Sequence, residues 1–390
     1  MANPNFEMVG TITLPKDSDK FKSYEENVFS DMWLSRRLKL SVHTGTNNHI
    51  VQIESFSQAD GKGKVMVFNN PTTEGGKASS EFVAFADRNK VDLTKVPNWA
   101  KRVIDLADRN KRFEMKNLLN KKESITDEEL RKVGCDSDAS LQEAYDASLK
   151  LRKEFIDDFD FIDYVKKVIE SGRFDGRNFK LSGKVVHQYS ERDGICYTSY
   201  IVDHIYLADE GEEQKATVTM KVLYKDGCID KSLVEEKGKY YLDCFTMSRD
   251  NRLKKDIPVP VQIVALADNE TNIRKADLVV KRFASVEDDK VMESGIRVDI
   301  INGTSRLALD ESMLTDEQRE LLELGLTTMD DLRREIGNDV AGSVNREYRF
   351  REFINGYTNC NKDTVYTPDD LVIGFKSEEE EDQELEDLFG

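Results

Sequence analysis

Residues 179–185 read Phe179-Lys180-Leu181-Ser182-Gly183-Lys184-Val185, and residues 6–12 read Phe6-Glu7-Met8-Val9-Gly10-Thr11-Ile12. Both segments have the form F-x-[ML]-x-G-x-[IV], in which every second residue up to the glycine is apolar. This alternation predicts a β-strand with one buried face. A glycine inside a strand is common at a bend. The sequence therefore predicts two long strands, each bent at its glycine.

Each segment opens a group of short strand-like runs that are separated by turn-rich sequence. The further runs of the first group are 33–42, 49–56, 64–68 and 81–86, and those of the second group are 195–207, 216–223, 239–248 and 258–265. A bent first strand that serves both sheets is typical of the oligonucleotide-binding (OB) fold, a five-stranded Greek-key barrel. We therefore expect an α+β, mainly β protein with two OB-like five-stranded barrels.

Helical features lie between and after the strand groups. We expect a helix from Asn98 to Ala107, a capping box at Thr126 and Glu129, and helical spacing of apolar residues over 140–172. After a strand-like run at 295–302, a capping box at Thr315 and Gln318 and a helix at 328–336 predict a helical C-terminal extension. The expected division is a first barrel, a helical connector, a second barrel, an extension and a tail, at 1–97, 98–172, 173–266, 267–376 and 377–390.

The formal net charge of −18 is unevenly distributed. Residues 1–112 hold 17 bases and 14 acids, and residues 173–256 hold 15 of each, so a local positive groove is possible in both barrels. The last thirteen residues, EEEEDQELEDLFG, hold eight carboxylates and no base. This run has too little apolar surface to offset the entropy of ordering, which predicts a disordered acidic tail.

The sequence lacks the motifs of most enzymes. Gly75-Gly76-Lys77-Ala78 lacks the spacing of a phosphate-binding loop, and His43, His49, His187 and His204 are not at metal-ligand spacing. The acids Asp157, Asp158, Asp160 and Asp163 could hold two metal ions of a nuclease. However, acidic side chains at the start of a helix also interact favourably with the positive end of the helix dipole. We expect no enzymatic activity, no catalytic residues, no metal and no cofactor.

The cellular setting follows from the cysteines and the apolar runs. The five cysteines are odd in number and form no CxxC pair, which predicts free thiols in a reducing cytoplasm. No basic N-terminal region is followed by an apolar stretch, and nowhere do 18 apolar residues run together. We expect a soluble protein that is not bound to a membrane. The oligomeric state is left open.

Bases and aromatic residues alternate along several of the expected strands, as in proteins that hold single strands by phosphate neutralisation and base stacking. Core packing or a solvated outer face would produce the same pattern. The candidate nucleic-acid-binding residues are Trp33, Arg36, Arg37, Lys39, Lys62, Lys64, Lys184, Tyr189, Arg192, Tyr197, Tyr200, Lys221 and Tyr224.

The chain resembles bacteriophage single-stranded DNA-binding proteins with two OB-type halves and an acidic tail. The likeness is carried by the tail, by 179–185 leading to 200–207, and by 33–42, 314–337, 363–366 and 371–372. It implies coating of single-stranded DNA during phage DNA replication or recombination, in the cytoplasm of the infected bacterial host.

The resemblance also implies that the tail recruits phage replication or recombination proteins, through Glu378, Glu379, Glu380, Glu381, Asp382, Asp387, Leu388 and Phe389. Such tails end on an aromatic residue, whereas Gly390 follows Phe389 here. The alternative hypothesis is an acidic protein-interaction or assembly module without DNA binding, which the overall charge favours.

Overall fold

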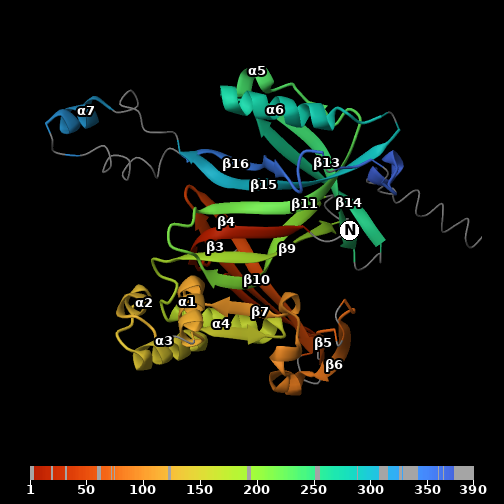
Figure 1. Ribbon diagram of the computed structural model, residues 1–390. Coiled ribbons are helices and arrows are strands. Elements are labelled where there is room, and N and C mark those ends of the chain that lie inside the picture. The colour runs from red at the N-terminus through yellow and green to blue at the C-terminus, as the bar shows by residue number, and fades with distance from the viewer. Residues whose placement is uncertain are drawn as a thin grey trace, which may run out of the picture.

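The computed structural model describes residues 4–18, 21–30, 33–58, 63–71, 73, 75–121, 124–190, 195–250, 255–287, 289–306, 315–324, 327, 341–358, 360–362 and 364–372. The tail at 377–390 and the helix expected at 328–336 lie outside these ranges. In the described part of the chain, the fold is mainly β, with a 15-stranded sheet and a separate two-stranded hairpin. Helices cover both ends of this assembly (Figure 1).

Five strands form a first closed ring. The antiparallel pairs β1–β3, β3–β4, β9–β10 and β9–β1 are completed by a parallel pair between β4 and β10. Helix α4 (Asp158–Glu170) comes between the third and fourth of these strands in the chain, and its four buried side chains join the main hydrophobic core. The ring strands are β1 (Asn5–Thr13), β3 (Trp33–Thr44), β4 (Asn47–Gln58), β9 (Asn178–Ser190) and β10 (Ile195–Leu207).

A second closed ring repeats this order. Strand β11 pairs with β13, β13 with β14 and β15 with both β11 and β16, all antiparallel, while β14 and β16 are parallel. Helix α6 (Glu270–Phe283) takes the place that α4 has in the first ring. The ring strands are β11 (Lys215–Lys225), β13 (Lys239–Asp250), β14 (Lys255–Leu266), β15 (Val291–Arg306) and β16 (Ala341–Phe353).

Strand β1 joins the two rings and changes partner at Gly10. One edge of β1 pairs with β9, and the other edge pairs with β11 up to Val9 and with β3 from Thr11. A Cβ atom at Gly10 would lie 2.1 Å from the carbonyl oxygen of His43. At Gly183 it would lie 1.9 Å from the carbonyl oxygen of Ile201. The sequence predicts a bend at each glycine; the structure shows a close backbone approach at both positions.

The two similar segments pair with each other instead of opening two barrels. In the antiparallel register, Phe6 lies opposite Gly183, Met8 opposite Leu181, and Gly10 opposite Phe179. Both segments therefore belong to the first ring. The prediction that each segment opens its own barrel is wrong, because residues 59–177 are inserted between the third and fourth strands of the first ring. Strands β9 and β10 return after this insertion to close the first ring.

The insertion contains short elements that the sequence predicted only in part. A 3₁₀ turn at Asn98–Ala100 and strand β7 (Arg102–Asp105) replace the helix expected up to Ala107, since β7 pairs in parallel with β10. Strand β8 (Arg152–Phe155) divides the expected 140–172 helix. The other elements are 3₁₀ helices at Phe85–Lys90 and Leu93–Lys95, β5 (Lys64–Asn69), β6 (Ser79–Ala84), α1 (Arg109–Leu119), α2 (Asp127–Lys132) and α3 (Asp138–Lys150).

Capping boxes were predicted correctly at two helices. The Thr126 side chain accepts a hydrogen bond from the Glu129 N–H at the start of α2, and Thr315 does the same for Gln318 at α7 (Asp316–Glu323). The remaining elements are β2 (Tyr24–Ser30), β12 (Ile229–Asp230), α5 (Val234–Lys237), β17 (Cys360–Asn361) and a 3₁₀ turn at Pro368–Leu371.

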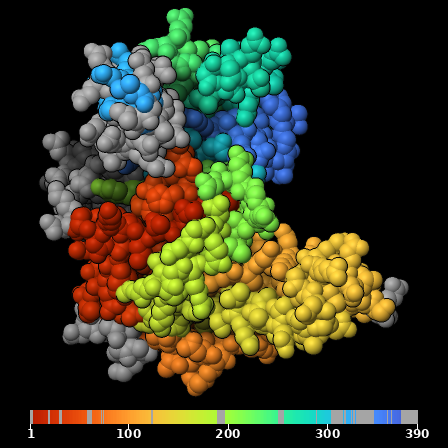
Figure 2. Space-filling model, turned by 90° about the vertical axis from the view of Figure 1, so that its left-hand side faces the viewer, coloured from red at the N-terminus to blue at the C-terminus, as the bar shows by residue number. Residues whose placement is uncertain are grey.

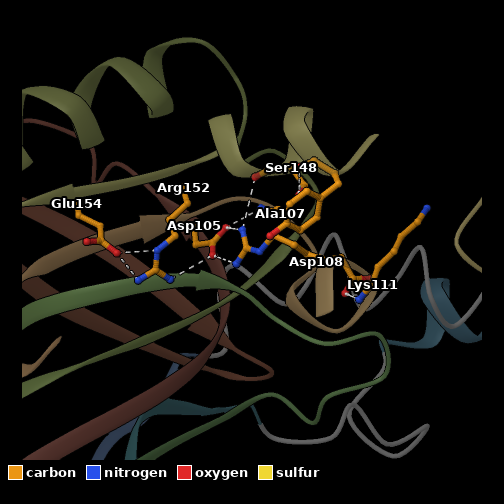
Figure 3. Close-up of polar contacts among 9 residues, drawn as sticks. Asp105, Ala107, Asp108, Lys111, Ser148, Arg152 and Glu154 are labelled. Atoms are coloured by element: carbon orange, nitrogen blue, oxygen red, sulfur yellow. Dashed lines mark hydrogen bonds and ion pairs between the residues drawn. The ribbon is translucent and has the colours of Figure 1, made fainter. Parts of the chain in front are cut away.

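A buried carboxylate fastens the inserted helices to the sheet. Asp105 is fully buried, and its oxygens accept hydrogen bonds from Arg112 and from the Ala107 N–H (Figure 3). Arg152 lies 3.6 Å from the same carboxylate and also pairs with Glu154. Separating Arg112 on α1 from Asp105 on β7 would leave an uncompensated buried charge. These contacts therefore hold α1 against β7 and β8. Helices α1 to α3 project from the rings (Figure 2).

Substitution of the two glycines tests the close backbone approach. We expect Gly10→Ala and Gly183→Ala each to lower the free energy of unfolding by about 3 kcal/mol or more, because the added methyl group overlaps a neighbouring backbone. Gly295→Ala is the control, since its Cβ would lie 3.4 Å from a side-chain atom of Ile354, an ordinary contact. Urea denaturation measures the change. Equal effects in all three variants would contradict this explanation.

Two buried histidines make stability depend on pH. Burial lowers the pKa of His49 and of His187 from 6.5 to about 4. The unfolded chain binds protons at these sites between pH 6.5 and 4 and the folded chain does not, so stability is present above pH 6.5 and is lost as the pH falls. The loss between pH 7 and pH 5 is up to about 2 kcal/mol for each histidine.

Urea denaturation at pH 7 and pH 5 measures this effect. His49→Gln and His187→Gln are each expected to reduce the difference between the two pH values, whatever their effect on stability at pH 7. An undiminished pH difference in both variants would assign the acid sensitivity to other groups.

Candidate nucleic-acid interface

The candidate residues on β3 lie on its two faces and differ in exposure. The side chain of Arg36 bonds to Glu26 of β2 at 2.8 Å and to Asp163 of α4 at 3.2 Å, and it is 16% exposed. Lys39 bonds to Glu25 at 2.8 Å and is 15% exposed. Arg37 bonds to Glu54 at 2.7 Å, yet 40% of its side chain is open to solvent. Arg37 is thus the most accessible of the three cations.

Of two tyrosines expected to stack on bases, Tyr224 is a core residue, which corrects the prediction for it. It is fully buried, its hydroxyl group lies 3.1 Å from that of Ser294, and no base can reach its ring. Tyr200 is partly buried against the core: it packs edge-on against Phe6, and its hydroxyl group lies 2.8 Å from that of Tyr348.

The other candidates are dispersed. Tyr197 on β10 is half exposed, Lys64 on β5 is exposed, Lys184 on β9 is half-buried opposite Asn5, and Lys221 on β11 is exposed and bonds to Glu293 at 2.7 Å. Lys62, Arg192, the side chain of Tyr189 and all residues of the acidic tail lie outside the part that the structure describes. The structure does not bring Tyr197 or Lys221 to the residues of β3.

Exposed apolar side chains gather where β3 begins and β4 ends. The rings of Phe29 and Phe56 stack with centroids 6.3 Å apart, and both are about two-thirds exposed. Trp33, Phe56 and Met66 line one cavity, and Met66 lies opposite Phe82 in the β5–β6 hairpin. An exposed apolar surface of this kind marks an interaction site. We call it the aromatic patch: Phe29, Trp33, Phe56, Met66 and Phe82.

A groove runs between the two rings along β11 and β15. It consists of three adjoining cavities. Lys215 and Arg351 line both the first and the second cavity, and Asn5 and Thr219 line both the second and the third. The pairing of β11 with β15 and with β1 forms its floor. We call the surface lined by these three cavities the junction groove.

The junction groove is basic in an acidic protein. Of the described residues that line it, six are basic and four are acidic, whereas acids exceed bases by 18 in the whole chain. The bases are Lys215, Lys221, Lys275, Arg297, Arg349 and Arg351, and the acids are Glu7, Glu213, Glu293 and Asp299.

Apart from Lys221, the sequence prediction missed this set. One feature of the sequence indicates part of the groove. Polar residues alternate with apolar ones at Lys215, Thr217, Thr219 and Lys221, so these four side chains share one face of a strand. The pairing of distant strands that completes the groove has no such local signal.

The acids at the start of α4 bind arginines. Asp157 caps the helix through the Asp160 N–H, Asp160 bonds to Arg88 at 2.7 Å, and Asp158 bonds to Arg102 at 2.6 Å. Burial raises the pKa of Asp157 to about 6. Among the described residues, no group of three or more potential ligands could hold a metal ion. The interpretation as helix-capping and structural acids is supported by these contacts.

Comparison with protein families and with curated protein sequences gave no match for this chain.

In the ranges that the structure describes, no helix is long and apolar enough to span a membrane. Four cysteines, Cys135, Cys228, Cys244 and Cys360, are free thiols.

Proposed function

We propose that this chain is a non-enzymatic, sequence-tolerant single-stranded DNA-binding protein built from two OB-type barrels. The strand order supports this proposal. In each ring, the third and fifth strands pair in parallel, the other neighbours pair antiparallel, and a helix lies between the third and fourth strands. OB folds bind oligonucleotides on the face of their second and third strands and on the loop between the first two. In the first ring these elements are β3, β4 and residues 14–32.

The observation that carries the proposal is the position of the aromatic patch on these elements. Phe29 lies on β2, within the connection between the first two ring strands, Trp33 lies at the start of the second ring strand and Phe56 lies on the third. Exposed rings stack on bases whatever the sequence, because every base has a π-face. The half-exposed guanidinium group of Arg37, on the same second strand, can bind a phosphate.

Internal ion pairs make this binding sensitive to salt. Arg37 is held by Glu25 and Glu54, so a phosphate has to compete with two carboxylates for the same cation. Phosphate neutralisation also releases counterions, and affinity then falls steeply as salt rises. We expect tight binding only at low ionic strength.

The acidic tail fits the same function as an internal competitor and as a docking peptide. Eight carboxylates within thirteen residues form a polyanion that competes with phosphates for cations. Partners of the tail, under this proposal, are phage replication or recombination proteins in the cytoplasm of the infected bacterial host. The apolar residues Leu388 and Phe389 give such a partner an anchor.

A second candidate function is that of an acidic protein-interaction module. The aromatic patch favours it, since exposed apolar surfaces also bind proteins. The net charge of −18 favours it too. The two candidates differ in one measurable property, because this module predicts no binding to oligothymidine at any salt concentration.

Replacement of the exposed rings tests the stacking surface. We expect Phe29→Ala and Phe56→Ala each to weaken binding to oligothymidine by roughly tenfold, because each loses a stack worth about 1 to 3 kcal/mol. Phe113→Ala is the matched control, since Phe113 is equally exposed but lies on the inserted helix α1. Fluorescence anisotropy of a labelled oligothymidine at low and moderate salt measures the affinity. Unchanged affinity in both patch variants would place the bases elsewhere.

Removal of the tail tests the competitor. A chain ending at Ser377 is expected to bind oligothymidine more tightly than the full chain, with the larger gain at low salt, because salt screens the tail. The same truncation is expected to abolish binding to partner proteins, measured by pull-down with the full chain as control. Weaker DNA binding after truncation would show that the tail is no competitor.

A further inference from the structure

We propose that the junction groove holds the phosphodiester backbone of single-stranded DNA across both rings. This inference rests on the proposed function and assigns a second contact surface to it, apart from the aromatic patch. The supporting features are the shape of the groove, the spacing of its cations and the kind of side chain that lines it.

The groove is long and regular enough for an extended chain. Its three cavities follow β11 from Lys215 to Lys221, a span of about 20 Å at the rise of a β-strand. Lys215 and Lys221 share one face of β11 with Thr217 and Thr219. Thr217 is buried and its hydroxyl group donates to the Glu7 carbonyl oxygen, so a cation lies at each end of the floor with the Thr219 hydroxyl group between them.

The opposite side of the floor adds further phosphate-binding groups. Arg297 on β15 lies beside Thr219, with its Nε atom 3.3 Å from the threonine hydroxyl oxygen, and 41% of its side chain is exposed. Arg351 on β16 lines two of the three cavities and is 38% exposed. Guanidinium, ammonium and hydroxyl groups are the usual donors to phosphate oxygens.

The groove offers little for base stacking. Of the aromatic residues that line it within the described ranges, Phe6 is buried and Phe350 lies under the ammonium group of Lys275 at 5.7 Å. The aromatic patch has the complementary composition, with exposed rings and few cations. We infer that the groove binds the backbone and the patch binds bases.

The two surfaces lie at opposite ends of the β3–β4 hairpin. Thr44 and Asn47 border the groove, whereas Trp33 and Phe56 belong to the patch. The twelve residues from Trp33 to Thr44 are separated by steps of about 3.3 Å and so span about 36 Å along the strand. A single strand bound to both surfaces would therefore follow the first ring over most of its length.

Two double variants test the groove through the same two ion pairs. Lys215 lies 3.0 Å from Glu7, and Lys221 lies 2.7 Å from Glu293. Both K215Q/K221Q and E7Q/E293Q remove these ion pairs, but the first makes the groove less positive and the second makes it more positive. A purely structural role predicts the same direction of change for both variants.

Oligothymidine binding to the full-length variants is measured by anisotropy across a salt series. We expect K215Q/K221Q to weaken binding by roughly tenfold at low salt and to reduce the slope of log K against log salt by about 1.4, which is 0.7 for each lost phosphate contact. We expect E7Q/E293Q to tighten binding. Thermal melting by circular dichroism confirms that both variants fold.

The possible outcomes separate this inference from the proposed function. If the wild type binds, Phe29→Ala weakens binding and K215Q/K221Q leaves affinity and slope unchanged, the groove is not a backbone site and the proposed function stands. Weaker binding by both double variants also overturns the inference, since charge is then not the cause. If the wild type does not bind at any salt concentration, the proposed function and this inference both fail.

Discussion

The close contact of β1 with its neighbours is the constraint on which the rest of the structure depends. A single strand contributes to the first ring and pairs with the opening strand of the second, and it changes partner at Gly10. The backbone of His43 occupies the place where any side chain at that position would lie. Without this approach β1 could not leave β11 and join β3 within two residues. The junction groove, which lies on the pairing of β1 with β11, depends on the same contact.

Many charged side chains of this protein pair with one another. Arginines and lysines on the first ring bind carboxylates of β2, β4 and α4, and Asp105 is enclosed by arginines inside the insertion. The partly exposed ion pairs of the first ring stabilise the fold weakly but fix the positions of long side chains. The cations of the groove and of β3 are thus already oriented, and an incoming phosphate exchanges with a carboxylate instead of ordering a free side chain.

Local sequence predicted local structure well and long-range pairing poorly. The strands at 6–12 and 179–185 and the capping box at Thr126 follow from neighbouring residues and were predicted correctly. Ring membership could not be predicted, since it depends on strands separated by the 59–177 insertion. The same limit applies to Tyr200 and Tyr224, whose alternation with polar residues fits both an exposed and a buried face. Lys215, Arg297 and Arg351 meet only through the pairing of β11, β15 and β16.

The insertion has a consequence for synthesis of the chain. The first ring lacks its fourth and fifth strands until residue 207 has been made, although its first three strands are complete at residue 58. Contacts of such large sequence separation form slowly, and the unpaired edges of β1 and β4 stay open to other chains in the meantime. Because β11 begins only eight residues after β10 ends, the first ring closes on a ribosome that is already making the second. The two rings are therefore expected to fold together.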